Sequence, residues 1–102
     1  MSPAGTAGNI RPRVQRRTYL FSGNVQGVGF RYTAQHLARG HPVSGYVRNL
    51  PDGRVEMVAE GEEINLDALL GALQRQMEGF IRDTKVSSGN ATGEFSGFTI
   101  RH

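Results

Sequence analysis

Apolar residues recur at helical spacing in two segments of the chain. In the first segment they fall at i, i+4, i+7 and i+8, so they form one stripe of a helix that begins at Phe30. Gly40 followed by Pro42 predicts the end of this helix. The second helix is expected from Glu62 to about Glu78, with its first acidic residues at the positive end of the helix dipole. The two stripes are Phe30, Ala34, Leu37 and Ala38, and then Leu66, Leu69, Leu70, Leu73 and Met77.

Five other segments have the pattern of β-strands. Branched and aromatic residues dominate the first two, and apolar residues alternate with polar ones in the third and the fifth. The sequence Pro51-Asp52-Gly53 lies between the second and third segments, and its proline and glycine favour a turn. These two strands are therefore expected to form a hairpin. The five predicted strands are 18–25, 43–50, 54–60, about 81–87 and 95–101.

The predicted order of elements is strand, helix, strand, strand, helix, strand, strand. This order is typical of an α+β protein with a ferredoxin-like split βαβ sandwich. We expect a five-stranded, mostly antiparallel sheet with two helices on one face. The same fold serves enzymes, RNA-binding domains and metabolite sensors, so it does not select a function by itself.

Charge is distributed unevenly along the 102 residues, which carry 12 basic and 9 acidic side chains. Four arginines lie in the first 17 residues, which contain no acid, and this leaves 8 basic and 9 acidic side chains, a net charge of −1, for the rest. Residues 1–14 are expected to be a disordered basic leader, because they contain much Gly, Pro and Ala and one large aliphatic residue. Residues 15–102 then form the domain. A nucleic-acid-binding domain usually has a basic face, so this division disfavours nucleic acid as a partner.

Two absences narrow the chemistry. The chain contains no cysteine, which excludes disulfides, thiolate metal ligands and a cysteine nucleophile. No apolar run approaches the roughly 20 residues that a membrane span requires. We therefore predict a cytoplasmic protein with no membrane partner and no thiolate metal site.

The most informative segment joins the end of the first strand to the start of the first helix. The first amides of a helix have no internal partner, and the helix dipole makes that end positive. Glycines there let an anion approach the backbone. The segment therefore predicts a cradle for phosphate or carboxylate. The amides expected to form it are those of Gln26, Gly27, Val28, Gly29 and Phe30.

Arg31 follows this cradle in the first helical turn, where a cation opposes the dipole at a cost of about 0.3–1 kcal/mol. A bound dianion would convert that cost into a gain, since a guanidinium can bind two oxygens at once. A simpler interpretation stays open: the glycines form only a tight turn, and Arg31 pairs with a carboxylate such as the C-terminus at His102.

Two known phosphate-loop patterns do not fit this segment. No Lys-Ser or Lys-Thr follows the glycines, and Tyr32 stands where a dinucleotide fingerprint needs glycine or alanine.

Three segments together resemble the acylphosphatase family over about residues 18–101. They are Val25-Gln26-Gly27-Val28-Gly29-Phe30-Arg31, Gly45-Tyr46-Val47-Arg48-Asn49 and Asp52-Gly53-Arg54-Val55-Glu56. The departures from the family pattern are small: Tyr46 stands where the family often has tryptophan, and 78–81 lacks a proline often found near there. Neither departure touches the positions that match the family's catalytic residues.

The resemblance implies an enzyme that hydrolyses the carboxyl–phosphate bond of small acyl phosphates without metal or cofactor. It also implies that Arg31 and Asn49 are the catalytic residues. We expect inorganic phosphate to be both product and competitive inhibitor, and the protein to be a monomer. The residues alone favour a different role for Asn49, that of a residue that caps the adjacent Pro-Asp-Gly turn, and only its place in the family motif favours catalysis.

Two other functions remain open at this stage. A non-catalytic domain of the same fold could bind an anionic metabolite with the same cradle and Arg31, and it would not need Asn49. An RNA-binding domain would carry aromatic residues on a central strand, whereas Gly27-Val28-Gly29-Phe30 lies on a bend.

Overall fold

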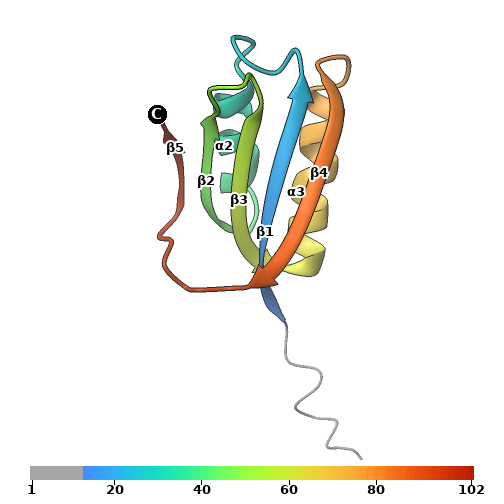
Figure 1. Cartoon of the computed structure of the whole chain (residues 1–102). Helices are drawn as coiled ribbons and strands as arrows, with labels where there is room; N and C mark the ends of the chain where they lie inside the picture. Colours follow the sequence, from blue (N-terminus) through green and yellow to red (C-terminus); the bar gives the residue numbers. More distant parts are fainter. Residues whose placement is uncertain (1–12) are drawn as a thin grey trace, which may run out of the picture.

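The computed structural model describes residues 13–102, which form one five-stranded sheet and two helices (Figure 1). This confirms the predicted α+β fold with its split βαβ order of elements. No helix in this part of the chain is both long and apolar enough to cross a membrane. In chain order the elements are β1 (Val14–Gly23), α2 (Phe30–Arg39), β2 (Ser44–Asn49), β3 (Val55–Glu62), α3 (Glu63–Gln76), β4 (Ile81–Asn90) and β5 (Phe98–Arg101).

The strands lie in the order β4-β1-β3-β2-β5, so the two strands that are last in the chain form the two edges of the sheet (Figure 1). All neighbours are antiparallel except β2 and β5, which run parallel. The predicted hairpin is present as β2 and β3, with Asn49 paired to Val55 at its closed end. The long segment after β4 runs past the lower ends of the strands in Figure 1 and reaches β5 at the opposite edge of the sheet.

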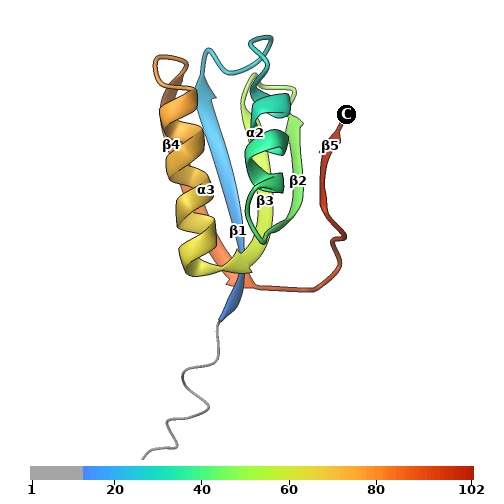
Figure 2. The same cartoon turned by 180° about the vertical axis from the view of Figure 1, so that it is seen from behind.

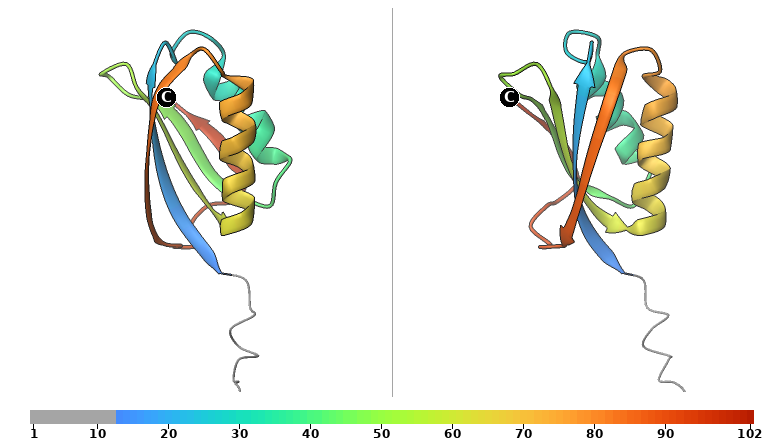
Figure 3. Two further views of the ribbon diagram at one scale, coloured as in Figure 1. Left: turned by 90° about the vertical axis from the view of Figure 1, so that its right-hand side faces the viewer. Right: turned by 45° about the vertical axis from the view of Figure 1, so that its right-hand side comes forward.

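Both helices cover the same face of the sheet (Figures 2 and 3). The core lies between these two layers, where alternate residues of β1 and β3 meet the apolar stripes predicted for α2 and α3. On β1, Tyr19 stacks against Phe21, and Phe21 contacts Phe30 of α2 with 5.0 Å between ring centroids. The contact between Phe21 and Phe30 fixes the start of α2 against β1.

The strand limits differ from the predicted ones. β1 begins at Val14, which pairs with Glu62, and it ends at Gly23 instead of continuing to residue 25. β4 continues to Asn90 because β1 supplies a partner for its polar residues along that whole length. The predicted leader lies almost entirely outside the described residues.

The arginines near the start of the chain are not confined to a basic leader that precedes the domain. Arg16 and Arg17 belong to β1 and form ion pairs with acidic residues of β3, α3 and the segment after β4. Only Arg11 of the four arginines precedes the described residues. Much of the basic excess therefore belongs to the folded part of the chain and is paired there.

Candidate active site

The loop between β1 and α2 is held at both ends by the sheet and the core. Its first residue, Asn24, donates its backbone N–H to the carbonyl of Phe80 at 2.9 Å. Val25 is fully buried, and Phe30 is buried at the other end of the loop. Figure 1 shows this loop at the same end of the sheet as the turn between β2 and β3.

The backbone of the loop takes a left-handed conformation at both of its glycines, with φ of 77° at Gly27 and 79° at Gly29. A Cβ atom added at either position would meet nothing within 4 Å beyond the adjacent residues, so glycine is favoured by this backbone conformation and not by lack of space. Within residues 13–102, no carbonyl or side chain accepts a hydrogen bond from the amides of residues 25–30. Those amides remain free to bind an anion at the positive end of α2.

A small cavity of about 180 Å³ lies against this loop. It brings together most of the residues that the sequence predicts for the site, including Arg31 from α2 and Asn49 from the end of β2. Gln26 and Val28 are not among its lining residues, whereas Val25 and Tyr32, which the sequence analysis did not assign to the site, are. The lining residues are Val25, Gly27, Gly29, Phe30, Arg31, Tyr32 and Asn49.

Arg31 lies in a first helical turn that contains no acidic residue. It forms no ion pair with any carboxylate of residues 13–102, so the predicted alternative of a carboxylate partner is not what the structure contains. Its Nη1 lies 3.3 Å from Nδ1 of His102 instead. The guanidinium can donate to that ring nitrogen when the nitrogen is unprotonated, and its positive charge stays available to an anion.

Asn49 is the last residue of β2 and is half-buried. The turn that follows is capped by Asp52, whose Oδ1 accepts from the backbone N–H of Arg54 at 3.1 Å. This hydrogen bond and those with the Arg54 side chain hold the pKa of Asp52 below its usual value. Within the described part of the chain the carboxamide of Asn49 makes no hydrogen bond, so the turn does not use it as a cap.

The side chain of Gln26 has a contact that sequence reasoning missed. Its Nε2 donates to the carbonyl of Leu50 at 2.8 Å and to the carbonyl of Arg54 at 2.9 Å. Both carbonyls belong to the turn between β2 and β3. The cradle loop is thereby attached to the segment that carries Asn49.

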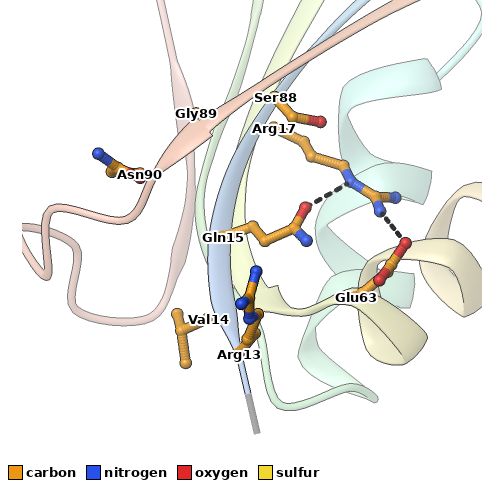
Figure 4. Close-up of a pocket in the computed structure, with 8 residues that line it drawn as sticks. All are labelled: Arg13, Val14, Gln15, Arg17, Glu63, Ser88, Gly89 and Asn90. Carbon is orange, nitrogen blue, oxygen red and sulfur yellow. Dashed lines mark hydrogen bonds and ion pairs between the residues drawn. The ribbon is translucent and has the colours of Figure 1, made fainter. Parts of the chain in front are cut away.

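A larger cavity of about 680 Å³ lies near the other end of the sheet, and its lining residues are drawn in Figure 4. The buried arginine there, Arg17, already has partners: its Nη2 lies 3.4 Å from Glu63, its Nε donates to Gln15, and its Nη1 pairs with Asp67. The hydrogen bond to Asp67 is the main reason why the pKa of Arg17 lies above its usual value. Because this guanidinium is occupied by carboxylates, the smaller cavity is the better anion site.

No group of three or more His, Asp or Glu side chains in residues 13–102 could hold a metal ion.

Comparison with known proteins points to one family. Residues 17–100 match the family model Acylphosphatase. A curated acylphosphatase of Archaeoglobus fulgidus is 58% identical over 53 residues, which are 52% of this chain and 60% of that protein. The match with the acylphosphatase of Methanospirillum hungatei is longer: 41% identity over 90 residues, covering 86% of this chain and 98% of the relative.

Solved structures agree with this similarity. The crystal structure of acylphosphatase from Bacillus subtilis superimposes with a TM-score of 0.78 at 34% sequence identity. The superposition covers 87% of this chain and 99% of the Bacillus protein. The residues that match the family model, 17–100, include both helices and the loop that borders the cavity.

Proposed function

The chain belongs to the acylphosphatase family, and from this membership we propose that Arg31 and Asn49 are its catalytic residues. Its activity is the hydrolysis of the bond between a carboxyl group and a phosphoryl group in acyl phosphates. The single observation that carries the proposal is the small cavity, where unpaired amides, a guanidinium and a carboxamide without a hydrogen-bond partner in residues 13–102 lie side by side.

The phosphoryl group binds at the start of α2. The amides of Gly27, Gly29 and Phe30 border the cavity, and those of Gln26 and Val28 complete the predicted cradle. These N–H groups and the Arg31 guanidinium stabilise the negative charge on the equatorial oxygens as the reaction proceeds. Because the donors are fixed before the substrate arrives, little reorganisation is needed in the transition state.

The leaving group explains why this set of residues is sufficient. An acyl phosphate releases a carboxylate, whose conjugate acid has a pKa of about 4, so the departing oxygen needs no proton. An enzyme for such a substrate needs neither a general acid nor a metal to assist departure. It needs to hold the phosphoryl group and to direct a water molecule in line with the breaking bond.

Asn49 orients that water. Its carboxamide offers one acceptor and two donors, which is enough to hold a water molecule toward phosphorus. The water oxygen forms the new bond to phosphorus while the bond to the carboxyl oxygen breaks and its electron pair leaves with the carboxylate. Asparagine is too weak a base to take the proton, so a phosphate oxygen of the substrate accepts it.

No observation in residues 13–102 favours the alternative of a non-catalytic binding domain. Competitive inhibition by inorganic phosphate follows from the proposal, since the product has the same oxygens as the bound substrate group. The monomeric state, the cytoplasmic location and the absence of nucleic-acid and membrane partners stay predictions from the sequence.

The test is benzoyl phosphate hydrolysis by the protein and two variants, with a chelator present. We expect full activity with the chelator. Arg31→Ala should weaken both phosphate inhibition and turnover, because it removes contacts made in the ground state and in the transition state. Asn49→Ala should lower kcat by roughly 100-fold or more while phosphate affinity changes little, because the water loses its orientation.

Matched controls are available in the same helix and in α3. Arg39→Ala removes an exposed arginine at the far end of α2, and Asn65→Ala removes a half-buried asparagine far from the cavity. Both should keep normal turnover. A requirement for magnesium, or near-normal kcat in a folded Asn49→Ala protein, would contradict the proposed roles.

A further inference from the structure

The side chain of Gln26 connects two parts of the site that are separate in the sequence. Both of its hydrogen bonds go to backbone carbonyls of a single turn, at 2.8 Å and 2.9 Å from Nε2. The two N–H bonds of the carboxamide are therefore both used. Gln26 itself does not line the cavity, so its side chain has no direct contact with a ligand there.

The two acceptor carbonyls define the base of the turn that follows Asn49. Leu50 is the next residue after Asn49, and its N–H donates to the carbonyl of Arg54 at 2.8 Å. The carbonyl of Leu50 also accepts from the N–H of Gly53 at 3.1 Å. Gln26 therefore attaches to the rigid, internally hydrogen-bonded end of the hairpin, one residue away from the carboxamide that directs the water.

The cradle loop has few other restraints between its ends. The amides of residues 25–30 form no hydrogen bonds within the described part of the chain, and two of these residues are glycines. Such a segment loses much conformational entropy when it is fixed. Between the buried Val25 and Phe30, the side chain of Gln26 supplies the polar attachment that holds the loop against the hairpin.

We propose that Gln26 is a positioning residue that sets the distance between the amide cradle and Asn49. This inference rests on the proposed catalytic role of Asn49. The phosphoryl group is held by the loop and the water by the hairpin, so their relative placement depends on the connection between these two elements. A displacement of about 1 Å between reacting groups can lower a rate by roughly 100-fold.

The experiment compares Gln26→Met with Gln35→Met. Methionine has a similar length and no hydrogen-bond donor. Gln35 is a matched control, because it is also half-buried and its Nε2 also donates to a backbone carbonyl, that of Phe98 at 3.3 Å, away from the cavity. We expect Gln26→Met to lower kcat about tenfold or more with less than about threefold change in phosphate inhibition, and Gln35→Met to leave both unchanged.

A double-mutant cycle separates positioning from a general loss of structure. If Gln26 acts through the placement of Asn49, then Gln26→Met should cost little additional kcat in the Asn49→Ala background. An equal loss of kcat in both backgrounds would overturn the inference. So would an equal loss in Gln35→Met. If Gln26→Met does not fold, Gln26→Asn gives the same comparison, because its shorter side chain keeps the donors and cannot reach both carbonyls.

A measurement without substrate distinguishes this inference from the proposed function. Backbone 15N order parameters of Gly27 and Gly29 should fall in Gln26→Met and stay unchanged in Gln35→Met. Unchanged order parameters would refute the positioning role even if catalysis proceeds as proposed. Normal kcat in Asn49→Ala, together with lower order parameters in Gln26→Met, would instead contradict the catalytic assignment and leave the structural connection intact.

Discussion

Arg31 occupies a position that a helix by itself disfavours. A cation in the first turn opposes the dipole, and no acidic residue of that turn compensates for it. Its contact with a ring nitrogen of His102 keeps the guanidinium near the cavity without neutralising its charge. The side chain is therefore stabilised mainly when an anion is present, which suits its proposed role in binding and releasing phosphate.

Arg31→Lys tests whether shape as well as charge is required. Lysine keeps the positive charge and loses the planar pair of donors, so one charged hydrogen bond is removed, which corresponds to about 1.5–3 kcal/mol. We expect phosphate inhibition to weaken by roughly 10- to 100-fold. The inhibition constant for phosphate measures this, with Arg39→Lys as the control at the other end of α2. Unchanged inhibition would mean that charge alone is sufficient.

Single residues of the site could be predicted where the chemistry is local in sequence. The glycines, the helix start and Arg31 lie within a few positions of one another, so their pattern predicts an anion cradle. The bonds of Gln26 could not be predicted, because their partners lie 24 and 28 residues away along the chain. The sequence does suggest His102 as a partner of Arg31, but through its terminal carboxylate and not through the ring nitrogen that lies beside the guanidinium. Asn49 could be assigned only through the family resemblance, since its neighbours favour a turn cap.

At the scale of elements, a buried carboxylate attaches the segment after β4 to the sheet. Glu60 of β3 is 4% exposed and accepts hydrogen bonds from the backbone N–H of Thr92 and Gly93 and from the Thr92 hydroxyl. Burial opposes its ionisation, but these hydrogen bonds and the nearby Arg16 outweigh that effect and lower the pKa of Glu60 below its usual value. The carboxylate thus holds the connection that leads to β5.

Glu60→Gln should destabilise the protein by about 1–3 kcal/mol at pH 7, because the charged acceptor is lost. Since the folded state lowers the pKa of Glu60, its contribution is complete above the unfolded value of about 4.3 and is lost as the pH falls through the folded value. The variant should therefore lose less stability than the wild type between pH 5 and pH 3. Urea unfolding over this pH range measures both effects, and exposed Glu78→Gln is the control. A parallel pH dependence in both proteins would contradict the role of Glu60.

The helices were easier to predict than the strand limits. The apolar stripes of α2 and α3 repeat over two turns or more, and each predicted stripe does face the core. The start of β1 and the end of β4 are polar, because these ends pair with each other and contribute little to the core. Strand pairing of this kind depends on backbone hydrogen bonds, which leave no hydrophobic pattern in the sequence.

At the scale of the whole molecule, residues 13–102 form the candidate site and the hydrophobic core described above. Two of the four arginines near the start of the chain, Arg16 and Arg17, also belong to this part and pair with acidic partners there. Catalysis and stability should therefore be properties of this part alone.

Removal of residues 1–12 tests that conclusion. We expect the shortened chain to keep kcat for benzoyl phosphate within about twofold and its thermal midpoint within a few degrees, since residues 13–102 retain the described site and core. Activity assays and thermal unfolding monitored by circular dichroism measure the two quantities. A tenfold fall in kcat would assign a catalytic contribution to that segment.

The placement of β4 and β5 at opposite edges has a consequence for the way the chain folds. β4 must pair with β1 across residues as far apart as Gln15 and Asn90, and the four residues of β5 can add only to an edge that β2 and β3 have already formed. Apart from the β2–β3 hairpin, the strand pairings thus close long loops, which slows folding in proteins of high contact order. Refolding should be limited by this search, and the final strand should dock last and detach first.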